Sequence, residues 1–177
     1  MHGAFSEDLQ RWIDLWTNHP GQPGSLLTRA GLCWTHQPLR ANALLRLSSA
    51  LTRRRVPIFP GILRRLNITL HGLDIAPSMP IGGGLYLPHT VGTVVMARSI
   101  GRNVTLVSNV TIGMRNTWGF PIIGNNVYIG AGARVLGDIT IGDGAIIGAN
   151  AVVLTNVPAG ATAVGVPARI IPASAPS

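Results

Sequence analysis

The segment IGAGARVLGDITIGDGAIIGANAVV, residues 129–153, decides the fold class, because an aliphatic residue returns in it at every sixth position. These positions are Ile129, Val135, Ile141, Ile147 and Val153, and glycine directly follows three of them. A period of six matches neither the period of an α-helix nor the alternation of a strand in a hairpin. It is typical of a solenoid of short parallel strands, in which three flat sides form one triangular coil.

The same period extends toward the N-terminus as far as residue 75. Thirteen positions from 75 to 153 carry Ile, Leu or Val, and glycine follows seven of them. We expect these side chains to point inward and to stack between coils, with glycine at the tight corners. A β-sandwich fits this spacing poorly. The thirteen positions are Ile75, Ile81, Leu87, Val94, Ile100, Leu106, Ile112, Ile123, Ile129, Val135, Ile141, Ile147 and Val153.

Two interruptions of the period mark candidate functional positions, since irregular segments of a regular scaffold often carry function. One extra residue lies between Leu87 and Val94, beside His89, and the register that follows places Arg98 at an inward position. The second interruption is GMRNTWGFP, residues 113–121, which predicts a loop that leaves the coil.

The N-terminal part has helical patterns instead. In FSEDLQRWIDLW, residues 5–16, Ser6 is a candidate N-cap and apolar residues follow at helical spacing. Further helices are predicted within residues 38–55 and 62–70. We therefore divide the chain into a helical segment, 1–70, a β-helix domain, 71–171, and a C-terminal tail, 172–177.

Charge and composition limit the function classes. The chain has a net charge of +8, all of its cations are arginine, and nine of them precede residue 72 against three acids. Such a flank suits an anionic membrane, an acidic substrate or nucleic acid, or else is a solvated helix face. The basic run TRRRV, residues 52–56, lacks interleaved aromatic residues, so we expect no nucleic-acid partner.

The cell compartment is predicted from cysteine content and from the N-terminus. A single cysteine, Cys33, excludes an intrachain disulfide and fits a reducing compartment. The first residues do not have the pattern of a signal peptide, and no run of apolar residues is long enough for a membrane span. We expect a cytoplasmic protein.

Several segments together resemble the left-handed β-helix acyltransferases of the hexapeptide-repeat family, and within it the serine acetyltransferase branch. The resemblance implies a mainly β fold, a left-handed parallel β-helix preceded by a short α-helical segment. It also implies a homotrimer with active sites between subunits, and acetyl-CoA as the donor. The segments are HGLDIAP (71–77), PHTVGTVV (88–95), VTIG (110–113), residues 129–153 and VGVPARII (164–171).

The same resemblance implies that His89 is the general base and that Asp74 orients it. The chemistry agrees, because an alcohol is a poor nucleophile and needs a base poised near neutral pH. A carboxylate on the other ring nitrogen fixes the tautomer and stabilises the imidazolium. The two residues are separated by slightly less than one coil, so adjacent coils can bring them together. A packed, structural histidine is the alternative interpretation of His89.

Donor binding is expected on the C-terminal coils. The resemblance implies contacts from small corner residues and from one arginine of the last segment, although glycine and alanine are also what any β-helix corner requires. Arg134 is a further candidate for the phosphates of CoA. The predicted donor-binding residues are Gly130, Ala131, Gly148, Ala149, Gly165 and Arg169.

Three departures from the serine acetyltransferase pattern concern the acceptor. Pro88 stands where the family has Asp, MAR (96–98) replaces GET, and GFP (119–121) replaces RHP. In the family, the Asp and the charged residues of that loop hold the charged ends of the amino acid. A zwitterion therefore has no evident partner in this sequence.

We accordingly expect acetyl transfer to a hydroxyl of a sugar or polysaccharide precursor, with Trp118 and Phe120 beside the acceptor. One alternative is a serine O-acetyltransferase of cysteine biosynthesis, and another is a non-catalytic trimeric scaffold. A zinc site needs several histidines, but His89 is the only one after residue 71, so no metal is expected.

Overall fold

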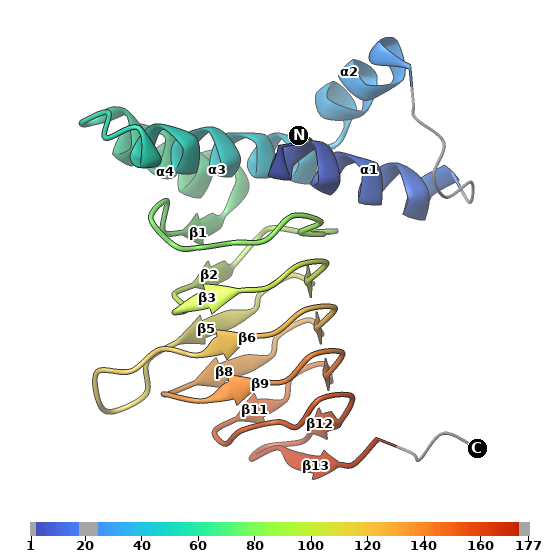
Figure 1. Ribbon diagram of the computed structural model, residues 1–177, viewed down its shortest axis with the longest axis vertical. Coiled ribbons are helices and arrows are strands. Elements are labelled where there is room, and N and C mark those ends of the chain that lie inside the picture. The colour runs from blue at the N-terminus through green and yellow to red at the C-terminus, as the bar shows by residue number, and fades with distance from the viewer. Residues whose placement is uncertain (1–2, 18–24, 174–177) are drawn as a thin grey trace.

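The computed structural model describes residues 3–17 and 25–173, with helices at one end of a parallel β-helix (Figure 1). The helices are α1 (Ala4–Thr17), α2 (Leu26–Thr35), α3 (Gln37–Arg53) and α4 (Phe59–His71). Helix α2 was not predicted. The proposed N-cap at Ser6 is wrong, because helix α1 begins at Ala4 and the Ser6 amide donates to the Gly3 carbonyl.

The strands form three flat sheets that run the length of the coil (Figure 1). We name them face A, β1-β2-β5-β8-β11, face B, β3-β6-β9, and face C, β4-β7-β10-β12-β13. All pairs are parallel except β12 with β13. The bounds are β1 (Leu73–Ile75), β2 (Thr93–Val95), β3 (Ser99–Ile100), β4 (Thr105–Leu106), β5 (Thr111–Gly113), β6 (Ile122–Ile123), β7 (Tyr128–Ile129), β8 (Arg134–Leu136), β9 (Thr140–Ile141), β10 (Ile146–Ile147), β11 (Val152–Val153), β12 (Thr162–Val164) and β13 (Arg169–Ile171).

The inward stacking of aliphatic side chains is confirmed at eleven of the thirteen predicted positions, which are buried. The exceptions are Ile81, which is half-buried, and Val94. Val94 is 38% exposed whereas Val95 is fully buried and pairs with Ile75. The segment around His89 therefore holds two extra residues, not one, before the inward position returns.

The prediction that Arg98 points inward is wrong for the same reason. Because Val95 is the inward residue, the corner that follows is one residue short and Arg98 faces solvent. Its guanidinium lies 2.7 Å from the Asp138 carboxylate, and its amide donates to the carbonyl of Pro121. Arg98 thus fixes the base of the loop that leaves the coil.

Corners stack so closely that some of them require glycine. At Gly101, a Cβ atom would lie 2.5 Å from the carbonyl oxygen of Gly124 in the next coil. A side chain there would displace backbone, which explains why glycine follows so many of the inward aliphatic residues.

The helices are anchored to the first coil by a buried ion pair. Asp8 of α1 is fully buried and accepts from Arg46 of α3 at 2.7 Å and from the Leu85 amide at 2.8 Å. Arg46 also donates to the carbonyls of Ile81 and Gly82. Burial raises the pKa of the Asp8 carboxyl, and the bond from Arg46 opposes that rise.

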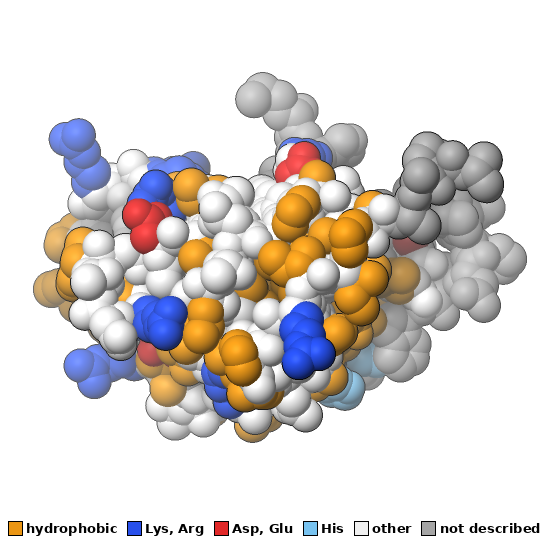
Figure 2. Space-filling view, turned by 90° about the horizontal axis from the view of Figure 1, so that it is seen from below, with side chains coloured by type: hydrophobic (Ala, Val, Ile, Leu, Met, Phe, Trp, Pro, Cys, Tyr) orange, Lys and Arg blue, Asp and Glu red, His pale blue; other side chains and the backbone are white. Residues whose placement is uncertain are grey.

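Two surface properties complete the fold. Within the described ranges, no helix combines the length and the apolar character needed to cross a bilayer. Seen from the C-terminal end of the coil, basic side chains are spread over the surface among neutral and hydrophobic ones, and some lie beside an acidic side chain (Figure 2).

Candidate functional site

His89 lies at the corner that joins face C to face A. It follows Tyr86, which bridges to β4, and precedes β2. The imidazole is exposed, and the next residue, Thr90, is buried and donates from its hydroxyl to the carbonyl of His71 at 2.7 Å. The hydrogen bond holds the turn that carries His89 against the end of α4.

Asp74 lies on the strand that follows this same helix end. Its neighbours in β1, Leu73 and Ile75, are buried, so Asp74 projects from the outer side of face A. A Cβ atom at Gly72 would lie 3.1 Å from the Cα of Val91. The segments that carry Asp74 and His89 are therefore packed side by side.

Asp74 has a partner that sequence reasoning missed. Both Nε and Nη2 of Arg64, on α4, lie 2.7 Å from Oδ1 of Asp74. Among the residues that the structure describes, no hydrogen bond engages Oδ2, and none joins Asp74 to His89. One carboxylate oxygen is thus held by Arg64 while the other is open to a further donor. Nothing in the sequence distinguishes Arg64 from its neighbour Arg65.

The corner that carries His89 continues as a column down the coil. The Asn109 amide donates to the Val91 carbonyl at 3.0 Å, and in later coils Gly132 donates to Ser108 and Asn150 to Ala131. Four predicted donor-binding residues lie in this column, two on each of two coils: Gly130 and Ala131, then Gly148 and Ala149.

The last two predicted donor-binding residues lie at the C-terminal end of the coil. Gly165 follows β12 and is exposed, while Arg169 is exposed on β13 opposite Val164. Because the two lower corners of this column are built of glycine and alanine, they offer backbone groups and little side-chain obstruction to an extended ligand. Arg134 is instead tied to the carbonyls of Asn109 and Gly132.

Trp118 and Phe120 lie on the loop between β5 and β6, at the opposite edge of face A (Figure 1). Trp118 is 84% exposed and packs edge-on against Phe120, with ring centroids 5.4 Å apart. Phe120, Met96 and Ala97 line a hollow of about 300 Å³. Face A separates this hollow from His89, so one chain does not bring the predicted acceptor residues to the predicted base.

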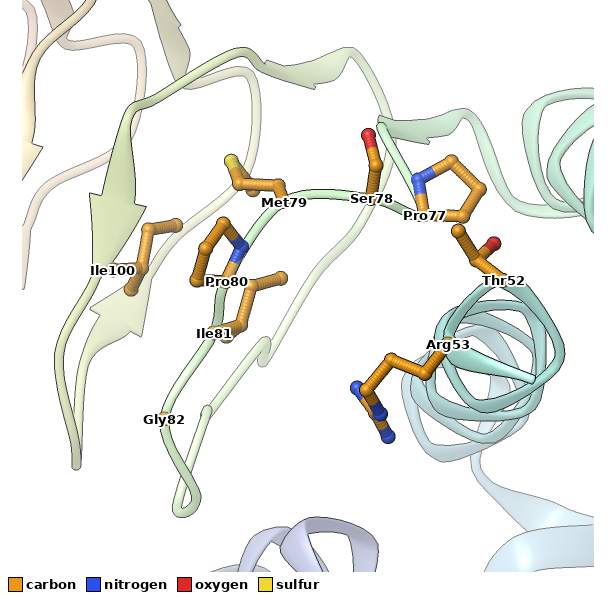
Figure 3. Close-up of a pocket in the computed structure, with 9 residues that line it drawn as sticks. All are labelled: Thr52, Arg53, Pro77, Ser78, Met79, Pro80, Ile81, Gly82 and Ile100. Atoms are coloured by element: carbon orange, nitrogen blue, oxygen red, sulfur yellow. The ribbon is translucent and has the colours of Figure 1, made fainter. Parts of the chain in front are cut away.

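A larger hollow, of about 590 Å³, lies between the end of α3 and the first coil. Arg53 extends from α3 toward the coil segment 77–82, and Ile100 lies on the far side of that segment (Figure 3). Arg53 is the only charged residue of its lining, which contains no group suited to act as a base. The described residues also hold no cluster of three or more His, Cys, Asp or Glu side chains that suits a metal ion.

The comparisons with known proteins agree on one family. The pattern of the bacterial transferase hexapeptide family (six repeats) matches residues 120–155. A serine acetyltransferase from Helicobacter pylori is 42% identical over 130 residues, which cover 71% of this chain and 76% of the relative. A serine acetyltransferase from Synechococcus elongatus is 38% identical, and the chain covers only 53% of its length.

Solved structures of the same enzymes have the same fold. Soybean serine acetyltransferase complexed with serine superposes with a TM-score of 0.80 at 32% identity, covering 95% of this chain and 68% of that chain. A serine acetyltransferase in complex with CoA gives a TM-score of 0.80 at 30% identity, covering 95% and 68%.

Proposed function

Because this chain belongs to the serine acetyltransferase family of hexapeptide-repeat proteins, we propose that it transfers an acetyl group from acetyl-CoA to a hydroxyl group of a small acceptor. The observation that carries the proposal is the placement of His89. The imidazole is exposed at the top of the corner column of small residues, packed beside the segment that holds Asp74.

The residues of the chain supply base catalysis and positioning. Acetyl-CoA, when bound, supplies the acetyl group as an activated thioester. His89 accepts the hydroxyl proton as the acceptor oxygen forms its bond to the acetyl carbon, and returns that proton to the sulfur when the carbon–sulfur bond breaks. The open Oδ2 of Asp74 is suited to accept from the imidazole and to stabilise its cation.

The proposed enzyme is a homotrimer. The support is that one chain holds an incomplete site, since His89 and the loop with Trp118 lie at opposite edges of face A. An adjacent subunit can place its own loop opposite His89.

Serine is the acceptor that the comparisons favour. Close relatives are serine acetyltransferases, and one solved structure contains serine. They therefore support the serine alternative better than the sugar acceptor predicted from the sequence, and they give no support to polysaccharide biosynthesis. The sugar remains a second candidate on one observation: neutral Pro88 and apolar Phe120 stand where charged partners for a zwitterion are expected, and Trp118 packs against Phe120.

An acceptor assay tests this proposal. With labelled acetyl-CoA, we expect L-serine to be acetylated with a kcat/KM of about 10⁴ M⁻¹s⁻¹ or more, the range of ordinary enzymes. The panel includes free sugars and nucleotide sugars. Turnover of a sugar that exceeds that of serine roughly a hundredfold and is lost in Trp118→Ala, with CoA binding intact, identifies the second candidate instead.

Replacing Arg64 tests the role of its contact with Asp74. We expect Arg64→Gln to lower kcat roughly tenfold, as loss of a charge-assisted hydrogen bond of about 1.5 kcal/mol implies, without changing the KM for acetyl-CoA. Arg64→Lys should restore part of the activity. The matched control is Arg65→Gln on the exposed side of α4; equal losses in both variants would contradict the assignment.

A further inference from the structure

Helix α4 buries polar side chains against the rest of the protein and exposes apolar ones, the reverse of the usual arrangement for a surface helix. Its fully buried residues are polar, Asn67 and His71, and the Asn67 amide donates to the carbonyl of Ala41 at 2.9 Å. Its large apolar residues are exposed instead, except for Leu63, which is half-buried. We call five exposed ones the α4 face, and each is between 43% and 76% exposed: Ile58, Phe59, Ile62, Leu66 and Leu70.

These five residues lie along one side of the helix, whereas Ile68, which is 40% exposed, lies on another side. The helical members Phe59, Ile62, Leu66 and Leu70 are spaced three or four apart, so they lie in line along the helix. Ile58 extends the line at the N-terminal end. Beyond Leu70 the surface continues into an apolar hollow of about 550 Å³, which is lined by Ala43, Leu44 and Arg40 among others. A continuous apolar stripe of this kind is typical of a binding surface.

The charged residues that border the α4 face are all cationic. Arg54 and Arg55 precede its N-terminal end and are exposed, Arg65 lies along the helix, and Arg40 borders the hollow next to Leu70. No acidic residue occurs anywhere from residue 15 to residue 73. A ligand that complements this surface therefore has both apolar groups and negative charge.

We propose that the α4 face binds the surface of an anionic lipid bilayer. An amphipathic helix lies in the plane of such a membrane with its apolar side chains at the acyl boundary, and arginines beside it reach the lipid headgroups. A contact between the α4 faces of two copies fits poorly, because it would set arginine against arginine with no acidic residue in either face.

Vesicle flotation with the full-length chain tests the proposal. We expect binding to vesicles of three parts phosphatidylcholine to one part phosphatidylglycerol, and little binding to phosphatidylcholine alone. Rising salt should weaken binding, because surface charges are screened. Arg54→Gln and Arg65→Gln should each reduce binding about fivefold, the effect of one cation near an anionic surface.

The apolar stripe is tested by the double variant Ile62→Ser/Leu66→Ser, which should reduce flotation at least tenfold. The matched control is Leu15→Ser, since Leu15 is a similarly exposed leucine on α1. Thermal melting and sedimentation are measured on every variant. Absence of flotation by the unaltered chain, or unchanged flotation by the double variant, overturns the proposal. A double variant that breaks the oligomer also overturns it, because the α4 face is then a subunit interface. None of these measurements depends on acetyl transfer, so their outcome is independent of the proposed function.

Discussion

Replacing His89 with alanine should lower the rate of acetyl transfer by roughly 10²–10⁴-fold, the usual contribution of a positioned general base. The exposed imidazole makes few packing contacts, so the variant should melt like the unaltered protein. Affinity for CoA should barely change, because the predicted donor contacts lie further down the corner column. Steady-state kinetics with labelled acetyl-CoA, beside equilibrium binding of CoA, measure both effects.

Two comparisons sharpen this result. Asp74→Asn should also lower kcat, because an amide can hold the imidazole in the wrong tautomer. Loss of activity in both variants with intact CoA binding excludes the non-catalytic scaffold. Near-normal turnover in His89→Ala would mean that His89 is structural and that another group activates the acceptor.

The β-helix could be predicted because its information is local and repeated. Each coil needs an inward aliphatic residue and a tight corner, and that requirement returns in the sequence at a fixed spacing. The predicted register failed only where the spacing breaks. Between Leu87 and Ile100, either Val94 or Val95 satisfies the composition, and only pairing with β1 selects Val95.

The site could be predicted only in part, because its contacts cross between elements. Arg64 and Arg65 are equivalent in the sequence, yet the orientation of α4 gives one of them to Asp74 and leaves the other exposed. Likewise, Trp118 and His89 belong to consecutive interruptions of the repeat but lie at opposite edges of face A. The exposure of the apolar stripe on α4 could not be predicted either. An amphipathic pattern in the sequence predicts that a helix has an apolar side, but it does not say whether the protein buries that side.

Replacing Arg46 with methionine should lower the free energy of unfolding by about 3–5 kcal/mol, which is a large share of the stability of most domains. The reason is the position of its partner. Asp8 is fully buried between α1, α3 and the first coil, and Arg46 is its cationic partner in the ion pair. Methionine keeps much of the side-chain volume, so the loss reports the unpaired carboxylate. For a chain of this size, the Tm should fall by roughly 10 °C.

The pH dependence of stability and a second variant distinguish the effect of the unpaired carboxylate from the effect of lost packing. Burial already raises the pKa of Asp8, and Arg46 opposes the rise. Without Arg46 the pKa should rise further, so the carboxyl binds a proton more readily in the folded than in the unfolded state. The stability lost by Arg46→Met should therefore be largest at neutral pH and shrink as the pH falls through the raised pKa.

Asp8→Asn removes the buried carboxylate but leaves the Arg46 guanidinium, and it should cost only about 1–2 kcal/mol, because Arg46 keeps the carbonyls of Ile81 and Gly82 as acceptors. The double variant Asp8→Asn/Arg46→Met should then be more stable at neutral pH than Arg46→Met alone, a coupling that urea unfolding measures directly. If the double variant is the less stable one at every pH, Arg46 acts through its packing and its carbonyl contacts, and the ion pair with Asp8 does not control the attachment of the helices to the coil.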